Sequence, residues 1–202
     1  MKTVGLIVAA GLSERMGQFK PLLPVGGKTM IEQTISIFQQ TNISDVFVVI
    51  GNHANELTEA LKHTNVHFVL NEAYATSDMF TSVRLGLEQI AEHTDAQAVF
   101  LLPADMPAVP PMILGRLLDR METQEVAIVF PSKNMRRLHP PLLHRRCFNA
   151  ITEYRGEDGL RGAFRSLDES IAYVETDDEG CSIDVDTPED YRRLLRHMRE
   201  VE

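Results

Sequence analysis

Two glycines and two cations gather within residues 11–20, directly after an apolar run that ends at Ala10. Gly11 and Gly17 let the backbone turn and approach a ligand closely, and successive backbone N–H groups in such a loop can form a concave anion site. Arg15 and Lys20 place fixed positive charge beside those amides. The loop lacks both the Gly-Lys-Ser/Thr ending of a Walker sequence and the three-glycine dinucleotide pattern. We therefore expect a phosphate site of another kind. The simpler interpretation is an ordinary βα loop that contains glycine and two solvated cations.

Carboxylates that could hold a metal ion lie far away in the sequence. Asp105 follows a buried apolar run, which places it at the carboxyl edge of a parallel sheet, where ligands bind. Asp184 and Asp186 are two residues apart, so on an extended backbone they project to the same side. Carboxylates are the usual protein ligands of hard divalent cations. The alternative is that these acids only form turns or cap a helix, and for Glu189 and Asp190 we favour helix capping.

Alternating strands and helices position these residues. Short apolar, β-branched runs, typical of strands buried on both faces, predict strands at 4–9, 45–51, 66–70 and 98–102, with further strands at 125–130 and 171–174. Apolar periodicity predicts helices at 30–39, 56–62, 79–91, 111–121 and 160–167, and a shorter helical run at 145–154. Thr29 and Glu32 fit a capping box, and Thr187 with Pro188 opens a last helix. This order predicts an α/β fold, with a mostly parallel central sheet and helices on both faces, as one domain over residues 1–202.

Composition narrows the range of partners. The chain has 202 residues, a formal net charge of -9 and two cysteines without metal-ligand spacing. An acidic surface repels nucleic-acid phosphates and anionic lipid, so we expect neither nucleic acid nor membrane as a partner. The apolar start is too short for a membrane span and is followed by charges that do not fit a signal peptide, so we expect a cytoplasmic protein with reduced thiols. No heptad pattern demands a second chain, and we expect a monomer.

The opening loop resembles a known signature. Ala9-Ala10-Gly11-Leu12-Ser13-Glu14-Arg15-Met16-Gly17, followed by Lys20 and Leu22-Leu23-Pro24, is similar to the loop of the molybdenum cofactor nucleotidyltransferases, in the nucleoside-diphospho-sugar transferase superfamily. The resemblance implies a three-layer Rossmann-like fold in which this loop wraps a nucleoside triphosphate. The implied nucleotide-binding residues are Ala9, Ala10, Gly11, Leu12, Ser13, Arg15 and Lys20, with the two cations on the phosphates.

Two acidic segments extend the resemblance. The segment 101–107 resembles the family's magnesium aspartate motif and the segment 182–190 its second acidic motif. The resemblance implies that Mg²⁺ is held by Asp105 and Asp186, that Asp184 supports the acceptor side, and that Arg15, Lys20 and Asp105 are the catalytic residues.

The middle of the chain matches the family less closely. The segments 71–74 and 81–87 resemble the nucleobase side, which implies that Ser82 faces the nucleotide. Between them, Ser77 or Asp78 stands where members usually carry glycine. Leu138 replaces the glycine of a Gly-His-Pro motif, and the resemblance implies that His139 reaches the acceptor. Arginines that could meet an acceptor phosphate, or simply be exposed charges, are Arg136, Arg137 and Arg161.

The resemblance also implies a reaction. An acceptor phosphate attacks the α-phosphorus of a nucleoside triphosphate in line and releases pyrophosphate. The Ala-Ala-Gly form of the loop resembles the members that use CTP, with molybdenum-bound molybdopterin as acceptor and a molybdoenzyme as a candidate recipient of the product. Two alternatives stay open: a sugar- or alcohol-phosphate nucleotidyltransferase, and a non-catalytic cofactor-binding maturation factor. The missing glycine fingerprint argues against a doubly wound dehydrogenase.

Overall fold

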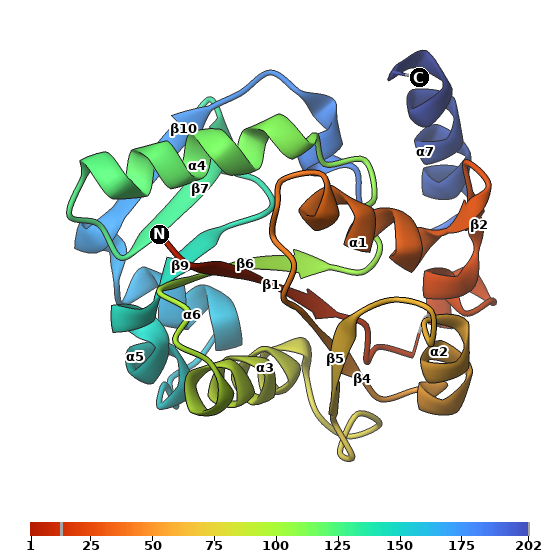
Figure 1. The fold of residues 1–202 in the computed structure, drawn as a ribbon, viewed down its shortest axis with the longest axis horizontal. Helices are drawn as coiled ribbons and strands as arrows, with labels where there is room; N and C mark the ends of the chain where they lie inside the picture. The colour runs from red at the N-terminus through yellow and green to blue at the C-terminus, as the bar shows by residue number, and fades with distance from the viewer. Residues whose placement is uncertain (13, 202) are drawn as a thin grey trace.

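A mixed sheet forms the centre of the protein. The computed structural model describes residues 1–12 and 14–201 (Figure 1). Within that part of the chain, the strands of the main sheet follow the order β10-β7-β9-β6-β1-β4-β5, with β8 paired to β7. Their bounds are β1 Thr3–Val8, β4 Val46–Ile50, β5 Val66–Leu70, β6 Ala98–Pro103, β7 Ile128–Lys133, β8 Arg136–Arg137, β9 Leu142–His144 and β10 Ile171–Glu175. A two-stranded sheet pairs β2 (Pro24–Val25) with β3 (Lys28–Thr29).

The strand pairing confirms the mostly parallel α/β fold. The neighbours β1–β4, β1–β6, β4–β5 and β7–β10 run parallel, and β9 lies antiparallel between β6 and β7. Four consecutive strands in space, β5, β4, β1 and β6, therefore end at one edge of the sheet. The loops that follow these four ends are the ones that can share a ligand.

Helices cover both faces of the sheet, as predicted (Figure 1). On one face, α1 and α4 pack against Ile7, Phe100 and Leu102; on the other, α3, α5 and α6 pack against Leu6, Val99 and Leu101. The helices are α1 Met30–Gln39, α2 Ala54–Ala60, α3 Met79–His93, α4 Pro111–Thr123, α5 Phe148–Thr152, α6 Gly159–Arg165 and α7 Pro188–Val201. None of the helices described here has the length and apolar character needed to cross a membrane.

Local capping fixes where two important helices begin. Thr29 and Glu32 form the predicted capping box at α1: the Thr29 hydroxyl accepts the Glu32 N–H, and the Glu32 carboxylate accepts the Thr29 N–H. At α7, Thr187 accepts the N–H of Asp190, whose carboxylate accepts the N–H of Thr187 in return. Both starts lie next to loops that reach the ligand edge of the sheet.

The structure corrects three expectations. The strand at 66–70 is not buried on both faces: Phe68 is 36% and Leu70 51% exposed, because β5 is the edge strand. The strand expected at 125–130 lies at Ile128–Lys133. The segment 145–154 begins as a 3-10 turn at Arg145–Cys147 before α5, and the antiparallel strand β9 precedes it without having been predicted.

Candidate functional site

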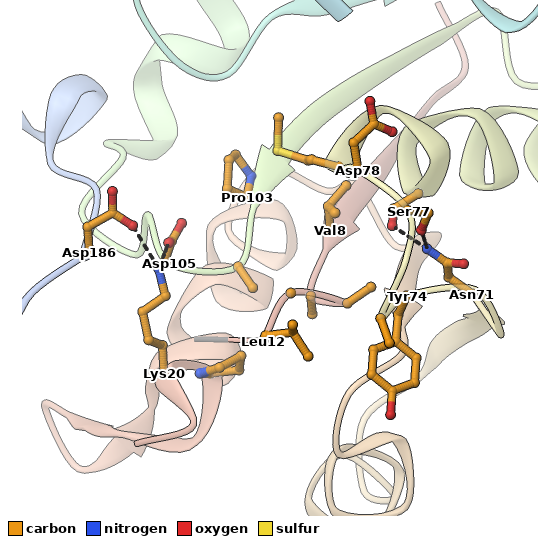
Figure 2. Close-up of a pocket in the computed structure, with 18 of the residues that line it drawn as sticks. Val8, Leu12, Lys20, Asn71, Tyr74, Ser77, Asp78, Pro103, Asp105 and Asp186 are labelled. Atoms are coloured by element: carbon orange, nitrogen blue, oxygen red, sulfur yellow. Dashed lines mark hydrogen bonds and ion pairs between the residues drawn. The ribbon is translucent and has the colours of Figure 1, made fainter. Parts of the chain in front are cut away.

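Loops from separate strands enclose a cavity of about 430 Å³ at the carboxyl edge of the sheet (Figure 2). The loop after β1 contributes Ala10 and Gly11, the segment after β5 contributes Asn71, and the segment after β6 contributes Asp105. Because parallel strands end at the same edge, residues 95 positions apart in the sequence, such as Ala10 and Asp105, line one space.

Lys20 joins the two predicted metal carboxylates. Its Nζ lies 2.6 Å from Oδ2 of Asp105 and 3.1 Å from Oδ1 of Asp186. Lys20 opens a 3-10 turn whose next residue, Pro21, is buried, and the preceding Phe19 stacks on the His53 ring with 4.5 Å between ring centroids. This packing on both sides holds the lysine at the site, where its side chain is only 14% exposed.

Burial and charge act against each other at this pair. Burial raises the pKa of the Asp105 carboxyl, and the Lys20 ammonium opposes that rise. Burial alone would lower the pKa of Lys20, but the charges and hydrogen bonds of Asp105 and Asp186 outweigh it, so the pKa of Lys20 lies above its ordinary value. Lys20 is therefore a permanent cation at this end of the cavity.

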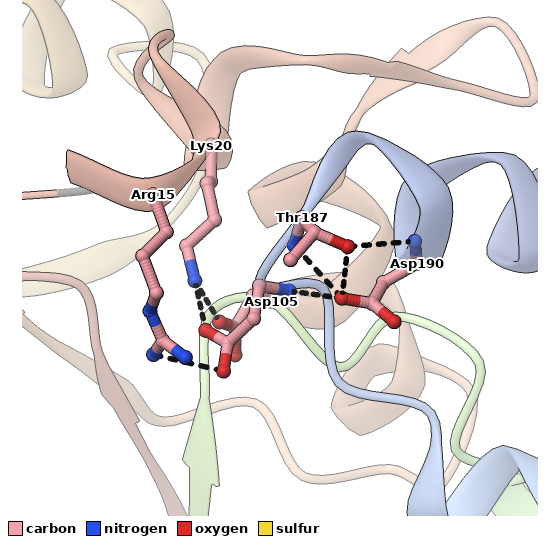
Figure 3. A network of polar contacts seen from close by, with 6 residues as sticks. Arg15, Lys20, Asp105, Thr187 and Asp190 are labelled. Carbon is pink, nitrogen blue, oxygen red and sulfur yellow. Dashed lines mark hydrogen bonds and ion pairs between the residues drawn. The ribbon is translucent and has the colours of Figure 1, made fainter.

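Arg15 completes the charged cluster (Figure 3). Its Nη2 lies 2.9 Å from Oδ2 of Asp186, whose other oxygen faces Lys20. The backbone N–H of Asp186 donates to the Asp190 carboxylate at 3.3 Å, so the capped start of α7 helps to hold the carboxylate of Asp186 in place. The predicted capping role of Asp190 is confirmed. The cluster defined by Arg15, Lys20, Asp105 and Asp186 is formally neutral, with two charges of each sign.

The backbone brings the two acidic motifs together. The N–H of Val185 donates to the carbonyl oxygen of Asp105 at 3.3 Å. The carbonyl oxygen of Ala104 in turn accepts the hydroxyl of Thr34 on α1 at 3.1 Å. These bonds anchor the loop after β6 to α1 and to the segment before α7, which explains why carboxylates 81 positions apart, Asp105 and Asp186, meet at one lysine.

The opposite side of the cavity carries neutral hydrogen-bonding groups (Figure 2). Asn71 is 1% exposed, and its Nδ2 donates to the hydroxyl oxygens of Ser77 at 3.1 Å and Ser82 at 2.9 Å. Its Oδ1 accepts the N–H of Ala73 at 3.1 Å. The ring of Tyr74 lines the same side. Asn71, Tyr74, Ser77 and Ser82, which we call the neutral wall, offer directional hydrogen bonds and an aromatic face, and the acidic residue Asp78 lies beside them in the lining.

Most of the residues proposed from the sequence line this one cavity. They are Ala9, Ala10, Gly11, Leu12, Arg15, Lys20, Ser82, Asp105 and Asp186. Ser13 lies outside the described residues. Sequence reasoning missed Ala75 and Met79, which also line the cavity. Met79 begins α3 and is 53% exposed; its place at the start of the helix that follows β5 is the sequence signal that could have found it.

The proposed acceptor residues lie outside the lining of this cavity. His139 is half-buried; its Nδ1 is buried and has no hydrogen-bond partner in the described part of the chain. Burial lowers the pKa of His139, and the nearby charge of Asp184 opposes that fall. Asp184 itself is exposed. The two residues are thus close to each other, and their role toward an acceptor stays a prediction.

One of the candidate acceptor arginines is occupied by other contacts. Arg137 pairs with Asp168 at 2.5 Å and donates to the Tyr173 hydroxyl at 3.0 Å. Its guanidinium also lies 5.0 Å from the centroid of the Phe130 ring. These contacts tie Arg137 of β8 to Phe130 of β7, to Tyr173 of β10 and to the turn before β10, which is a structural role.

The chain is similar to known proteins over almost its whole length. The chain is 29% identical over 198 residues to the molybdenum cofactor cytidylyltransferase of Escherichia coli (strain K12), with 97% of each chain covered. It is 27% identical over 198 residues to the nicotine blue oxidoreductase of Paenarthrobacter nicotinovorans, with 95% of each chain covered.

Solved structures of similar proteins share the fold of this chain. Rv0371c from Mycobacterium tuberculosis H37Rv superimposes with a TM-score of 0.81 at 28% identity, covering 97% of this chain and 98% of that one. A structure of the same protein in complex with manganese gives a TM-score of 0.75 at 27% identity, covering 97% of this chain and 99% of that one. Residues 5–171, which include Lys20 and Asp105, match the family model described as the MobA-like NTP transferase domain. The chain is a nucleotidyltransferase that belongs to the MobA-like NTP transferase family.

Proposed function

We propose that this nucleotidyltransferase transfers CMP from CTP to a phosphorylated acceptor, molybdenum-bound molybdopterin, and releases pyrophosphate. The observation that carries the proposal is the charged cluster at one end of the cavity, where Lys20 bridges Asp105 and Asp186. Nucleotidyl transfer needs charge at one end of the nucleotide and a neutral binding surface at the other, and the cavity supplies both.

The chain's own residues would act by binding and electrostatics. Arg15, Lys20 and the backbone N–H groups of the loop after β1 would hold the triphosphate. An acceptor phosphate oxygen then attacks the α-phosphorus in line, the new P–O bond forms, and the bond to the leaving pyrophosphate breaks. No covalent enzyme intermediate is needed. Lys20 would stabilise the negative charge that grows on the leaving group, because its raised pKa keeps it charged.

The donor set suits a hard divalent cation. Asp105 and Asp186 present carboxylate oxygens to one point, which the Lys20 ammonium occupies, and the described residues hold no cluster of three or more metal-binding side chains. Magnesium commonly takes one or two carboxylates and completes its shell with water and substrate phosphates. The charged cluster is formally neutral, so a bound triphosphate requires added positive charge. A divalent ion at these aspartates, Mg²⁺ in our proposal, would neutralise phosphate charge; the manganese complex of the mycobacterial relative supports this assignment.

The choice of base and acceptor rests on similarity. Ala9-Ala10-Gly11 resembles the loop form of the CTP-using members, and the relative from Escherichia coli that spans almost the whole chain is named a molybdenum cofactor cytidylyltransferase. Both observations support CTP as donor and molybdopterin as acceptor.

Equilibrium titration with CTP, GTP, ATP and UTP in Mg²⁺ tests the proposal. We expect the wild-type protein to bind CTP most tightly, and Lys20→Ala to weaken CTP binding at least tenfold because the triphosphate loses its buried cation. Lys28→Ala, which removes an exposed lysine of β3, is the matched control and should bind CTP as the wild type does.

Each other outcome has a distinct meaning. Preference for GTP would overturn the assignment of CTP. Failure to bind any nucleotide, together with no release of pyrophosphate when molybdopterin is added, would overturn the proposed function. Release of pyrophosphate with a sugar phosphate but not with molybdopterin would move the acceptor to that class.

A further inference from the structure

Asn71 links the segments that carry the other residues of the neutral wall. It follows the last residue of β5, and its backbone N–H donates to the carbonyl of Ile50 at 2.8 Å, so its backbone is fixed to the sheet. From there the side chain reaches Ser77, in the loop before α3, and Ser82, inside α3. One buried amide thus holds the loop and the helix that line this side of the cavity.

The hydrogen bonds of Asn71 have a fixed direction. The backbone N–H of Ala73 needs an acceptor, which places Oδ1 of Asn71 toward it and turns Nδ2 toward both serines. Each serine oxygen therefore accepts from the amide. Among the described residues, neither serine hydroxyl donates to a protein acceptor. The protons of both hydroxyls remain available to a group in the cavity.

We infer that Asn71 is a positioning residue that makes Ser77 and Ser82 act as hydrogen-bond donors to the nucleobase, and that this polarity selects cytosine. The inference rests on the proposed function, which puts the triphosphate at Lys20 and leaves the base for the opposite side of the cavity. Cytosine carries two neighbouring acceptors, N3 and O2, on its Watson–Crick edge. Uracil has a donor at N3, guanine has a donor at N1, and adenine has a single acceptor there.

Replacing the hydrogen-bond donor of Asn71 by an acceptor tests this inference. In Asn71→Asp the side chain keeps its shape and still accepts the Ala73 N–H, but a carboxylate can only accept hydrogen bonds. Both hydroxyls would then donate to residue 71 and present lone pairs to the cavity, which suits the N3–H of uracil. We expect the ratio of CTP to UTP affinity, measured by equilibrium titration, to fall about tenfold or more.

The ratio separates polarity from general effects. The added negative charge repels both triphosphates equally and cancels in the ratio. Asn52→Asp is the matched control: Asn52 follows β4 at the same sheet edge but does not line the cavity, so the ratio should stay at its wild-type value. A melting temperature near that of the wild type shows that the variant is folded.

The outcomes distinguish this inference from the proposed function. A wild-type protein that binds no nucleoside triphosphate would overturn both. A wild-type protein that binds CTP, together with an unchanged CTP-to-UTP ratio in Asn71→Asp, would overturn only the role of Asn71. A wild-type preference for a purine would overturn this inference and also CTP as the proposed donor. If Asn71→Asp fails to fold, Ser77→Ala in the surface loop decides: the ratio should fall severalfold, and an unchanged ratio overturns the inference.

Discussion

The two ends of the cavity recognise a ligand by different physical means. At one end, Arg15, Lys20, Asp105 and Asp186 are charged and act through fields that reach several ångströms. At the other end, Asn71 and its two serine partners are neutral and act only through contacts of defined direction. In our proposal, the charged end therefore governs the rate of group transfer, whereas the neutral end governs which nucleotide is bound.

Burial differs between the ends in a way that fits these roles. Side-chain exposure is 14% at Lys20, 19% at Asp105 and 30% at Asp186, so incoming phosphates can reach the charges. Asn71 is 1% and Ser82 2% exposed, so the neutral wall is part of the packed structure. A rigid wall with fixed hydrogen-bond directions loses affinity sharply when a base of the wrong pattern enters.

Neutralising the charged end should have the largest effect. We expect Asp105→Asn, which keeps the shape of the side chain, to lower kcat about 100-fold or more, because it removes one of the two carboxylates beside Lys20. Steady-state release of pyrophosphate measures the effect. The concentration of Mg²⁺ or Mn²⁺ needed for half-maximal rate should rise as well.

The control is a carboxylate away from the cavity. Asp119→Asn alters an exposed residue of α4 and should leave kcat unchanged. A wild-type kcat in Asp105→Asn would show that the charged end does not govern the rate, and the comparison between the two ends would then fail.

The neutral end should respond in binding rather than in rate. Gly51 ends the bridge after β4, and a Cβ placed there would lie 2.5 Å from Cβ of Tyr74 and 3.0 Å from Cβ of Ala10. Gly51→Ala should therefore displace Tyr74 from the wall and raise KM for CTP roughly tenfold, with kcat within about twofold of the wild type.

A matched glycine tests whether this effect is local. Gly115→Ala, at an exposed position of α4, places its Cβ in open space and should leave KM and kcat unchanged. If Gly51→Ala lowers kcat by the same factor by which it raises KM, the neutral wall is coupled to the reacting phosphates. The two ends of the cavity would then not act separately.

The charged end could be predicted from the sequence, because its residues directly follow elements with strong signals. The apolar run of β6 ends beside Asp105, and the loop with Lys20 follows β1. Parallel strands then bring such residues to one edge without further information. The strand β9 could not be predicted, since it has three residues between proline-rich and arginine-rich segments and shows no alternation long enough to detect.

The neutral end could be predicted only in part. Similarity suggested Ser82, but the hydrogen bonds of Asn71 to residues six and eleven positions further on depend on how the loop folds over the start of α3. A serine inside a helix carries no local pattern that reveals such a partner. His139 and Asp184 show the converse case: the resemblance proposed them for the acceptor, but the structure places them outside the lining of the cavity.

The smallest expected effect concerns Asp190, which supports the charged end through the start of α7 and does not belong to the charged cluster. Hydrogen bonds from Thr187 lower the pKa of Asp190 in the folded protein, so this carboxylate stabilises the fold while it is ionised. Asp190→Asn should lower the free energy of unfolding by about 1 kcal/mol at pH 7, the usual contribution of a helix cap. That contribution is complete above the pKa of the unfolded side chain, near 4, and is lost as the pH falls through the lower folded value.

Urea denaturation at several pH values measures this difference. Wild type and Asp190→Asn should differ at pH 7 and converge as the pH falls through the lowered folded pKa of Asp190, because the protonated carboxyl then resembles the amide. Glu189→Gln, in the same turn but exposed, should show a smaller difference at pH 7. If Asp190→Asn also lowers nucleotide affinity, the cap contributes to the site by fixing Asp186, whose N–H it accepts. If only the free energy of unfolding changes, the ion pairs with Lys20 and Arg15 suffice to hold the Asp186 carboxylate, and the charged end does not depend on the helix cap.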